Sequence, residues 1–366
     1  MPTRYRAENV GSLLRTPELL AARAAYAAGN LRIEDLRAAE DRSILQVFEG
    51  QRKAGIDIYT DGEQRRGSWM TDMAEACEGF VSNRVMREWK GPGGGMEGST
   101  ANAVGGKLRK LRKMNESELP FLKRNAPGPY KVTLPAPSNF MLASYQKGIT
   151  DKVYPDRDEM LDDLVKIVRD EIQWLVSGGV PYIQLDNPFY PHYQLDPRQT
   201  EIFQEMGLDG AKEFEKGVAA DNRSIAGISR DKVTVACHVC RGNSRSRWTA
   251  EGGYDAMAEQ LFNGLEVDTF LLEYDTARAG GFEPLRHMPR RKTVVLGLVT
   301  SKEPELEPQE ELLRRIEEAS RFMPLENLAL SSQCGFASVA AGNLLSMDDQ
   351  WRKLELVADT ARKVWG

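Results

Sequence analysis

The sequence predicts an α/β protein, a (β/α)8 TIM barrel with an insertion between its second and third strands. Short apolar runs alternate with longer amphipathic stretches, which is the pattern of βα units and a parallel sheet. Eight such runs occur along the chain, and eight units favour a closed barrel over an open sheet. No Gly-x-Gly-x-x-Gly motif follows a predicted strand, so a dinucleotide-binding fold is not indicated.

The predicted strands end in turn residues or in polar residues. They cover residues 7–14, 56–60, 130–134, 182–185, 232–237, 269–272, 293–299 and 328–331. Apolar residues repeat with a helical period in 158–177, 307–323 and 346–364. Pro17 suits the first position of a helix after the first strand. Strands and helices therefore alternate through most of the chain.

One segment interrupts this alternation. Residues 79–129 separate the second and third predicted strands, and this distance is too long for an ordinary βα connection. The segment holds a glycine-rich turn at 91–95 and a basic stretch at 107–113. We expect either a lid that covers a substrate or a surface excursion with a flexible turn. Residues 1–366 are otherwise expected to form one barrel domain.

Composition excludes several classes of partner. The chain has 49 Lys and Arg against 54 Asp and Glu, a net charge of −5, which argues against a nucleic-acid partner. No apolar run is long enough to span a membrane, and the first residues lack the apolar segment of a secretory signal. Four cysteines in 366 residues do not make a disulfide scaffold. We therefore expect a cytoplasmic protein that acts on small molecules; the sequence does not predict its oligomeric state.

The most informative polar residues follow predicted strands, where a barrel carries its chemistry. His238 and Cys240 alternate at the end of the fifth strand, so they point to the same side. Glu273 ends the sixth strand and Cys334 follows the eighth. Imidazole, thiolate and carboxylate are ligands of zinc, and sulfur ligands favour this ion. We expect these four residues to bind Zn2+, against the alternative of inert core residues.

A weakly held Glu273 would make this site catalytic. A site with four protein ligands is normally closed and structural. If an incoming thiol displaced the carboxylate, the metal would bind the thiol as thiolate, which is a nucleophile. The hypothesis is alkyl transfer from an alkyl donor to a small-molecule thiol substrate, giving a thioether.

The remaining cysteines and histidines are not expected to bind metal. Cys77 lies in a helical pattern, and Cys237 alternates with His238 and should face the helices. Both are expected to be small core residues. His192 and His287 are expected to lie in surface loops.

Six motifs occur in an order that is specific when they are taken together. They are Asn9-Val10-Gly11-Ser12, Asp61-Gly62-Glu63, Leu185-Asp186-Asn187-Pro188, His238-Val239-Cys240, Glu273 and Gln333-Cys334-Gly335. With these motifs the chain resembles the catalytic half of cobalamin-independent methionine synthase. That family belongs to the zinc-dependent thiol alkyltransferases, within the barrel superfamily that includes uroporphyrinogen decarboxylase.

The resemblance implies a homocysteine pocket beside zinc held by the four residues named above. Val10, Gly11 and Ser12 match the segment that holds the amino-acid carboxylate. Glu63 and Asp186 match the acids that hold the ammonium, a role that paired carboxylates suit. The alternative for these two acids is a structural hydrogen bond to neighbouring loops.

Three positions depart from the family pattern, and two of them concern the methyl donor. Ala143 stands where the family has a Trp that stacks on the pterin of methylfolate. Lys302 stands where the family has a His that delivers a proton to the leaving folate, and Asn187 replaces an acid. Lys302 is the candidate catalytic residue, as a general acid or an anion-binding group; the alternative is an exposed loop lysine.

The leading interpretation is zinc-dependent methyl transfer to homocysteine, with methylfolate, a methylated corrinoid protein or a small methylated metabolite as donor. A second interpretation is epoxide opening by a zinc-bound thiol, similar to epoxyalkane:coenzyme M transferase. Coenzyme M has a sulfonate and no ammonium, so the paired acids argue against it. A metal-free decarboxylase and a non-catalytic zinc-stabilised barrel are the remaining alternatives, and Cys334 with the His-x-Cys pair argues against the decarboxylase.

Overall fold

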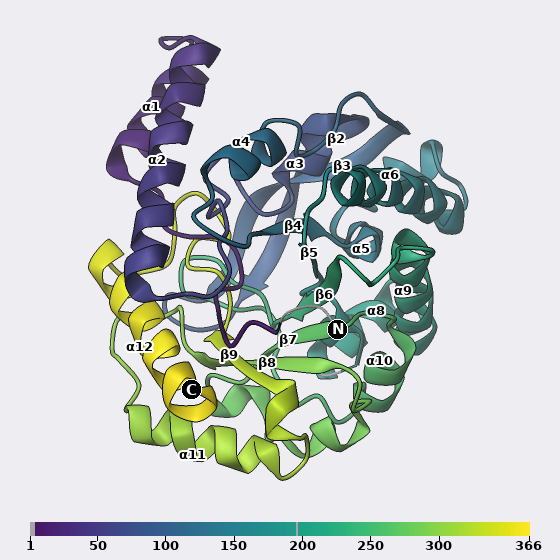
Figure 1. The fold of residues 1–366 in the computed structure, drawn as a ribbon. Helices are drawn as coiled ribbons and strands as arrows, with labels where there is room; N and C mark the ends of the chain where they lie inside the picture. The colour runs from purple at the N-terminus through teal and green to yellow at the C-terminus, as the bar shows by residue number, and fades with distance from the viewer. Residues whose placement is uncertain (1–3, 195–196) are drawn as a thin grey trace.

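The chain folds around a curled parallel sheet, seen in a computed structural model that describes residues 4–194 and 197–366 (Figure 1). The sheet has seven strands in the order β1-β9-β8-β7-β6-β5-β4, and every neighbouring pair is parallel. The strands are β1 (Ala7–Glu8), β4 (Lys131–Pro135), β5 (Tyr182–Asp186), β6 (Thr234–Val239), β7 (Thr269–Glu273), β8 (Thr293–Val299) and β9 (Leu328–Ser332). The α/β class is therefore confirmed, with seven of the expected runs forming strands.

Helices surround this sheet on its outer side (Figure 1). The longer ones are α1 (Pro17–Ala27), α2 (Ile33–Ala54), α6 (Arg157–Ser177), α9 (Gly210–Ile225), α11 (Gln309–Ser320) and α12 (Met347–Trp365). The shorter ones are α3 (Thr71–Ala76), α4 (Glu118–Asn125), α5 (Phe140–Ala143), α7 (Tyr190–Gln194), α8 (Pro197–Glu205) and α10 (Ala258–Gly264). The helices expected from apolar periodicity correspond to α6, α11 and α12.

The expected strand at 56–60 is reduced to a single bridge, and β1 is shorter than expected. Tyr59 makes one parallel bridge with Tyr130, next to β4. The backbone N–H of Asp57 donates to the carbonyl of Ala7 in β1 at 3.0 Å. The segment therefore links the two edges of the curled sheet without a continuous ladder of hydrogen bonds.

Gln51 of α2 provides the hydrogen bonds that a ladder would have made. Its amide nitrogen donates to the carbonyl of Thr60 at 2.8 Å, and its oxygen accepts from the Thr60 N–H at 2.9 Å. The same oxygen accepts from Asn9 Nδ2 at 3.0 Å. Because Gln51 is fully buried, these backbone groups have no access to water as an alternative partner.

The interior of the curled sheet is filled by side chains. Ile58, from the bridging segment, packs there with residues of β5, β6, β7, β8 and β9: Tyr182, Ala236, Leu271, Val295 and Ala329. A larger core lies between the strands and the helices. The strands therefore enclose a packed interior, and the space for a ligand lies at their ends. In the described residues, no helix combines the length and apolarity needed to cross a bilayer.

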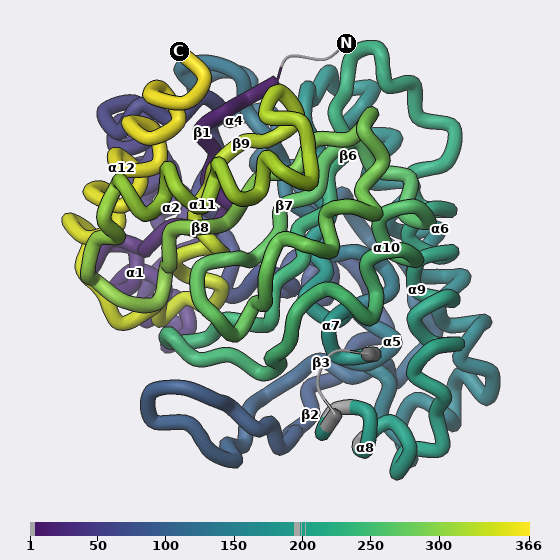
Figure 2. Tube along the Cα trace, turned by 90° about the horizontal axis from the view of Figure 1, so that it is seen from below, coloured from purple at the N-terminus to yellow at the C-terminus, as the bar shows by residue number. Residues whose placement is uncertain are grey.

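A long hairpin stands apart from the parallel sheet. Strands β2 (Cys77–Trp89) and β3 (Gly95–Lys110) pair antiparallel, and Figure 2 shows them at the end of the molecule opposite the C-terminus. Cys77 begins β2, so its helical assignment is wrong, although it is buried as expected. Lys110 Nζ lies 2.8 Å from Glu171 Oε2, so the base of the hairpin is paired to α6.

We predict that Gln51→Leu lowers the free energy of unfolding by about 2–6 kcal/mol. The buried N–H and C=O of Thr60 would each lose a partner, at a cost of about 1–3 kcal/mol per group. Gln46→Leu, on the exposed side of the same helix, is the matched control and should change the value by less than about 0.5 kcal/mol. Urea unfolding measures both. Equal stability of the two variants would contradict the role given to Gln51.

Candidate metal centre

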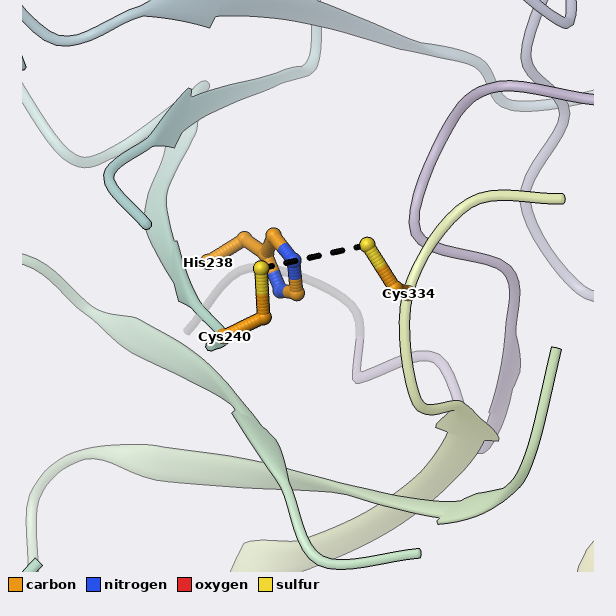
Figure 3. A group of neighbouring side chains, drawn as sticks. All are labelled: His238, Cys240 and Cys334. Carbon is orange, nitrogen blue, oxygen red and sulfur yellow. Dashed lines mark hydrogen bonds between the residues drawn. The ribbon is translucent and has the colours of Figure 1, made fainter. Parts of the chain in front are cut away.

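Three of the four predicted metal ligands lie together at the carboxyl end of the sheet. His238 is the penultimate residue of β6, Cys240 directly follows that strand, and Cys334 follows β9; the three side chains point toward one another (Figure 3). One ligand atom from each lies within 4.8 Å of the others, and the two sulfur atoms are 3.9 Å apart. The curl of the sheet brings β6 and β9 together at this end, although two strands separate them in the ladder.

The imidazole of this group lacks the partners that buried polar groups usually have. Both ring nitrogens of His238 are buried and have no hydrogen-bond partner among the described residues. A hydrogen bond from Cys240 and the nearby His238 hold the pKa of Cys334 well below its usual range, although burial opposes this. An unsatisfied imidazole beside two cysteine sulfurs is a donor set suited to zinc.

Glu273, the fourth predicted ligand, lies outside this group. Its Oε2 accepts from the backbone N–H of Arg241 at 2.9 Å and from Gln333 Nε2 at 3.0 Å. Its Oε1 accepts from Arg278 Nε at 3.0 Å. Burial raises its pKa, but the charges of Arg241, Arg278 and Lys302 outweigh this and lower the pKa to about 2. The carboxylate therefore contacts the residues next to both cysteines, since Arg241 follows Cys240 and Gln333 precedes Cys334.

Lys302 is buried, so it is not an exposed loop lysine. Its Nζ donates to Asn243 Oδ1 at 3.2 Å and approaches the carbonyl of Gly242 at 3.5 Å. The ammonium therefore supports the loop that follows Cys240. Among the described residues, Lys302 is not one of those that line the cavity beside the metal ligands.

A cavity of about 480 Å³ opens onto the metal-ligand group. His238, Cys240 and Cys334 line it together with the predicted substrate residues Val10, Ser12, Glu63 and Asp186. Its size falls in the range of pockets for small organic ligands, about 300–1,000 Å³. One space therefore joins the candidate metal ligands to most of the residues predicted to bind the thiol substrate.

Glu63 is held with one carboxylate oxygen available. Its Oε1 accepts from Thr133 Oγ1 at 3.1 Å and lies 3.8 Å from Arg66 NH1, whereas Oε2 is buried without a partner in residues 4–194 and 197–366. Burial raises the pKa of Glu63, and Arg66 and Arg15 oppose that shift. Its backbone has a positive φ of 55°, a conformation that non-glycine residues rarely adopt and that often marks a functional position.

Asp186 ends β5 directly beside His238 on β6. Gln184 Nε2 donates to its Oδ1 at 2.7 Å. Burial raises the pKa of Asp186 to about 7, with His238 opposing the shift. Two buried acids therefore face the cavity, and a cation placed between them would favour their ionised forms.

The segment with Val10, Gly11 and Ser12 lies between Glu63 and the loop that contains Cys334. A Cβ on Gly335 would stand 1.9 Å from Ser12 Oγ, so this glycine allows Ser12 to lie beside Cys334. A Cβ on Gly11 would lie 3.1 Å from Glu63 Oε1. Val10 and Ser12 line the cavity, whereas Gly11 provides the close approach between this segment and Glu63.

His192 is a cavity residue that the sequence analysis misplaced. It lies in α7, is buried, and lines the cavity rather than a surface loop. Its ring nitrogens lie 3.1 Å from the carbonyl of Pro188 and 3.0 Å from Thr249 Oγ1. Its position shortly after β5 is the available signal, because loops at this end of the strands carry site residues.

Two positions that depart from the family pattern, one after β4 and one after β5, have different surroundings. Ala143 lines the cavity, so a small side chain leaves space there. Asn187 is buried, and its Nδ2 donates to Ser138 Oγ at 2.7 Å and to Asp221 Oδ2 at 2.9 Å. Asn187 is therefore a structural residue beneath the site.

Comparisons with known proteins agree with this geometry. The chain matches a family model described as "Cobalamin-independent synthase, Catalytic domain" over residues 5–347. It is 37% identical to the uncharacterized protein YxjH of Bacillus subtilis, covering 99% of this chain and 95% of that protein. It is 25% identical to a protein named methionine synthase from Saccharolobus solfataricus, covering 97% and 93% of the two chains.

Solved structures show the same architecture. A putative vitamin-B12 independent methionine synthase from Listeria monocytogenes is 29% identical, with a TM-score of 0.76 and coverage of 100% and 99%. A B12-independent methionine synthase from Shewanella sp. W3-18-1, solved with selenomethionine, has the same fold, with 21% identity, a TM-score of 0.74 and coverage of 98% and 97%. The chain therefore belongs to the cobalamin-independent methionine synthase family, a family of methyltransferases.

Proposed function

We propose that this protein transfers a methyl group to the sulfur of homocysteine, giving methionine, in a zinc-dependent reaction. The observation that carries the proposal is one cavity lined by three candidate metal ligands and by two buried acids suited to an ammonium group. Relatives named methionine synthase match nearly the full length of the chain, which supports the same activity.

His238, Cys240 and Cys334 would hold the zinc ion, and the two unsatisfied nitrogens of His238 fit this role. Bound zinc would supply a Lewis acid that lowers the pKa of the acceptor thiol and keeps its sulfur nucleophilic at neutral pH. Glu273 is the exchangeable fourth ligand of the proposal. Its hydrogen bonds with Arg278 and Gln333 would hold the carboxylate in place when it does not bind the ion.

Glu63 and Asp186 would bind the substrate ammonium, and the segment with Val10, Gly11 and Ser12 would bind its carboxylate. Glu63 Oε2 has no partner of its own, so an ammonium would satisfy it. A thiol carrying a sulfonate in place of the ammonium would leave both acids without a cation. The paired acids therefore favour homocysteine over the coenzyme M type of thiol.

The methyl donor would occupy the rest of the cavity, where Ala143 leaves space. In the transfer, the C–S bond forms as the bond between the methyl group and the donor breaks, and the donor leaves with the electron pair. We propose that the excursion at 79–129 acts as a cover, because both strands of the hairpin contribute to the cavity wall. Lys302 as a proton donor to the leaving group stays a prediction. The free cysteines support a reducing location such as the cytoplasm.

Removal of a sulfur ligand should abolish metal binding. We predict that Cys240→Ser and Cys334→Ser each lose most of the bound zinc and all methyl transfer, because an alcohol is a far weaker zinc ligand than a thiolate. Zinc content by atomic emission after dialysis measures the effect. Cys237→Ser is the matched control, because Cys237 packs in the core on the other face of β6 and should keep one zinc. Full zinc content in both ligand variants would remove the proposed site.

The role of Glu63 can be tested on the substrate ammonium. We predict that Glu63→Gln weakens homocysteine binding to the zinc-loaded protein by about 1.5–3 kcal/mol, the size of a hydrogen bond to a charged group. Calorimetric titration measures this change. The control ligand is 4-mercaptobutyrate, which lacks only the amino group and should not bind more weakly to the variant than to the unsubstituted protein. Equal losses for both thiols would show that Glu63 does not read the ammonium.

A further inference from the structure

The hairpin supplies one wall of the cavity. Met86, Arg87, Glu88 and Trp89 of β2 line it, as do residues 99–102 of β3. The predicted thiol-binding residues come from the ends of the parallel sheet and from the segments around Val10 and Glu63. The hairpin wall is therefore a separate surface that the proposed homocysteine site does not use.

The hairpin wall is held in place by the loop that follows the metal ligands of β6. Lys90 and Trp248 exchange backbone hydrogen bonds of 2.8 and 3.1 Å. Arg247 NH1 lies 2.5 Å from Glu97 Oε2, and its guanidinium lies 5.1 Å from the centre of the Trp89 ring. These contacts fix the wall relative to the loop that begins at Cys240.

The cavity face of this wall carries a positive charge, Arg87, for which the described part of the chain provides no counterion. Arg87 pairs in register with Glu97, but the Glu97 carboxylate is bound to Arg247. The neighbouring Glu88 lies 2.8 Å from Arg198 Nε. Among the described residues, no carboxylate lies within ion-pair distance of Arg87, and its recorded contact is with the Trp89 ring at 5.8 Å.

This arrangement has an energetic cost that an anionic ligand would remove. Arg87 is half-buried, and burial lowers its pKa, because a charge taken from water without a partner is unfavourable. A guanidinium presents a planar pair of N–H donors that matches carboxylate or phosphate oxygens. A ligand anion in the cavity would therefore supply the missing partner.

We propose that Arg87 binds an anionic group of the methyl donor. This inference rests on the proposed function and adds the chemical class of the donor: a small molecule with its transferable methyl group at one end and a carboxylate or phosphate at the other. The cavity of about 480 Å³ has room for such a molecule beside an amino-acid thiol. The acids at 63 and 186 repel the anionic end, so the two substrates have opposite charge preferences.

The donor class can be tested with alkylating agents that react with thiols by the same chemistry. The zinc-loaded full chain, saturated with homocysteine, is treated with ω-bromocarboxylates of increasing chain length and with their primary amides. The C–S bond forms as the C–Br bond breaks, bromide leaves, and the thiol proton goes to buffer. Mass spectrometry measures the thioether yields. For each chain length, the yield with the carboxylate is divided by the yield with the amide. This ratio is then divided by the same ratio for homocysteine without protein, which removes the intrinsic difference in reactivity. The ω-bromophosphonates of the same lengths then rank carboxylate against phosphate-like anions.

We expect at least one chain length at which the protein prefers the carboxylate tenfold or more. Arg87→Met should reduce this ratio at least tenfold, and Arg87→Lys should keep part of it because the charge remains. Arg84→Met is the matched control: Arg84 lies on the same strand, is exposed and does not line the cavity. It should keep the full preference.

Three outcomes would overturn the proposal. The first is no carboxylate preference at any length, as expected if the donor is a methylated protein that needs no anion site. The second is a preference that survives in Arg87→Met. The third is a loss of homocysteine affinity in Arg87→Met as large as the loss in donor preference, which would place the thiol substrate on Arg87. Failure of the proposed function itself would give a different result. The zinc-loaded protein would then accelerate the alkylation of homocysteine by neither the carboxylates nor the amides.

Discussion

The geometry of the candidate metal centre depends on one buried carboxylate. Glu273 accepts from the backbone of Arg241 and from the side chain of Gln333, and these residues adjoin Cys240 and Cys334. Two loops from strands that are not neighbours are therefore tied to the end of β7. Hydrogen bonds of this kind, to residues that adjoin metal ligands, set the positions of the ligands themselves.

In the proposed function, the same carboxylate would keep a site with two thiols from being closed. In this structure its charge is neutralised by Arg278, which lies 2.9 Å away, so leaving the metal group does not expose an uncompensated buried charge. A movement toward the ion would exchange charged hydrogen bonds for a metal bond. The energies of the carboxylate bound to Arg278 and of the carboxylate bound to the ion would therefore differ less than if it had no alternative partner. An exchangeable ligand requires such a small difference.

Much of the fold and part of the site could be predicted from the sequence, because both follow from local patterns. Apolar runs mark β4 to β9, and polar residues after β6 and β9 converge because parallel strands end on the same side. The segment at 56–60 also reads as a strand, but its hydrogen bonds go to Gln51. Nothing in the local sequence distinguishes a ladder partner from a side chain of the preceding helix.

Residues whose roles arise from long-range packing could not be predicted in this way. The position of His192 shortly after β5 is a signal, but its burial depends on the short helix α7 and on its contact with Thr249. Arg87 lies in a stretch with several charged residues, where a solvated cation is the ordinary expectation. Arg87 has no ion pair with the neighbouring acids because these acids already pair elsewhere. Glu97 pairs with Arg247, and Glu88 pairs with Arg198.

The distribution of charge in the cavity connects the hairpin to the reaction. A methyl transfer between two small molecules requires that each occupies its own place, since an acceptor bound in the donor position cannot react. In the proposed function, the acids at 63 and 186 would favour the acceptor with its ammonium and disfavour an anion in the same place. Arg87, on the hairpin wall, would instead favour an anionic group. The hairpin therefore supplies a charge that the ends of the sheet do not provide, and the pairing of its own acids with Arg247 and Arg198 leaves that charge available to a ligand.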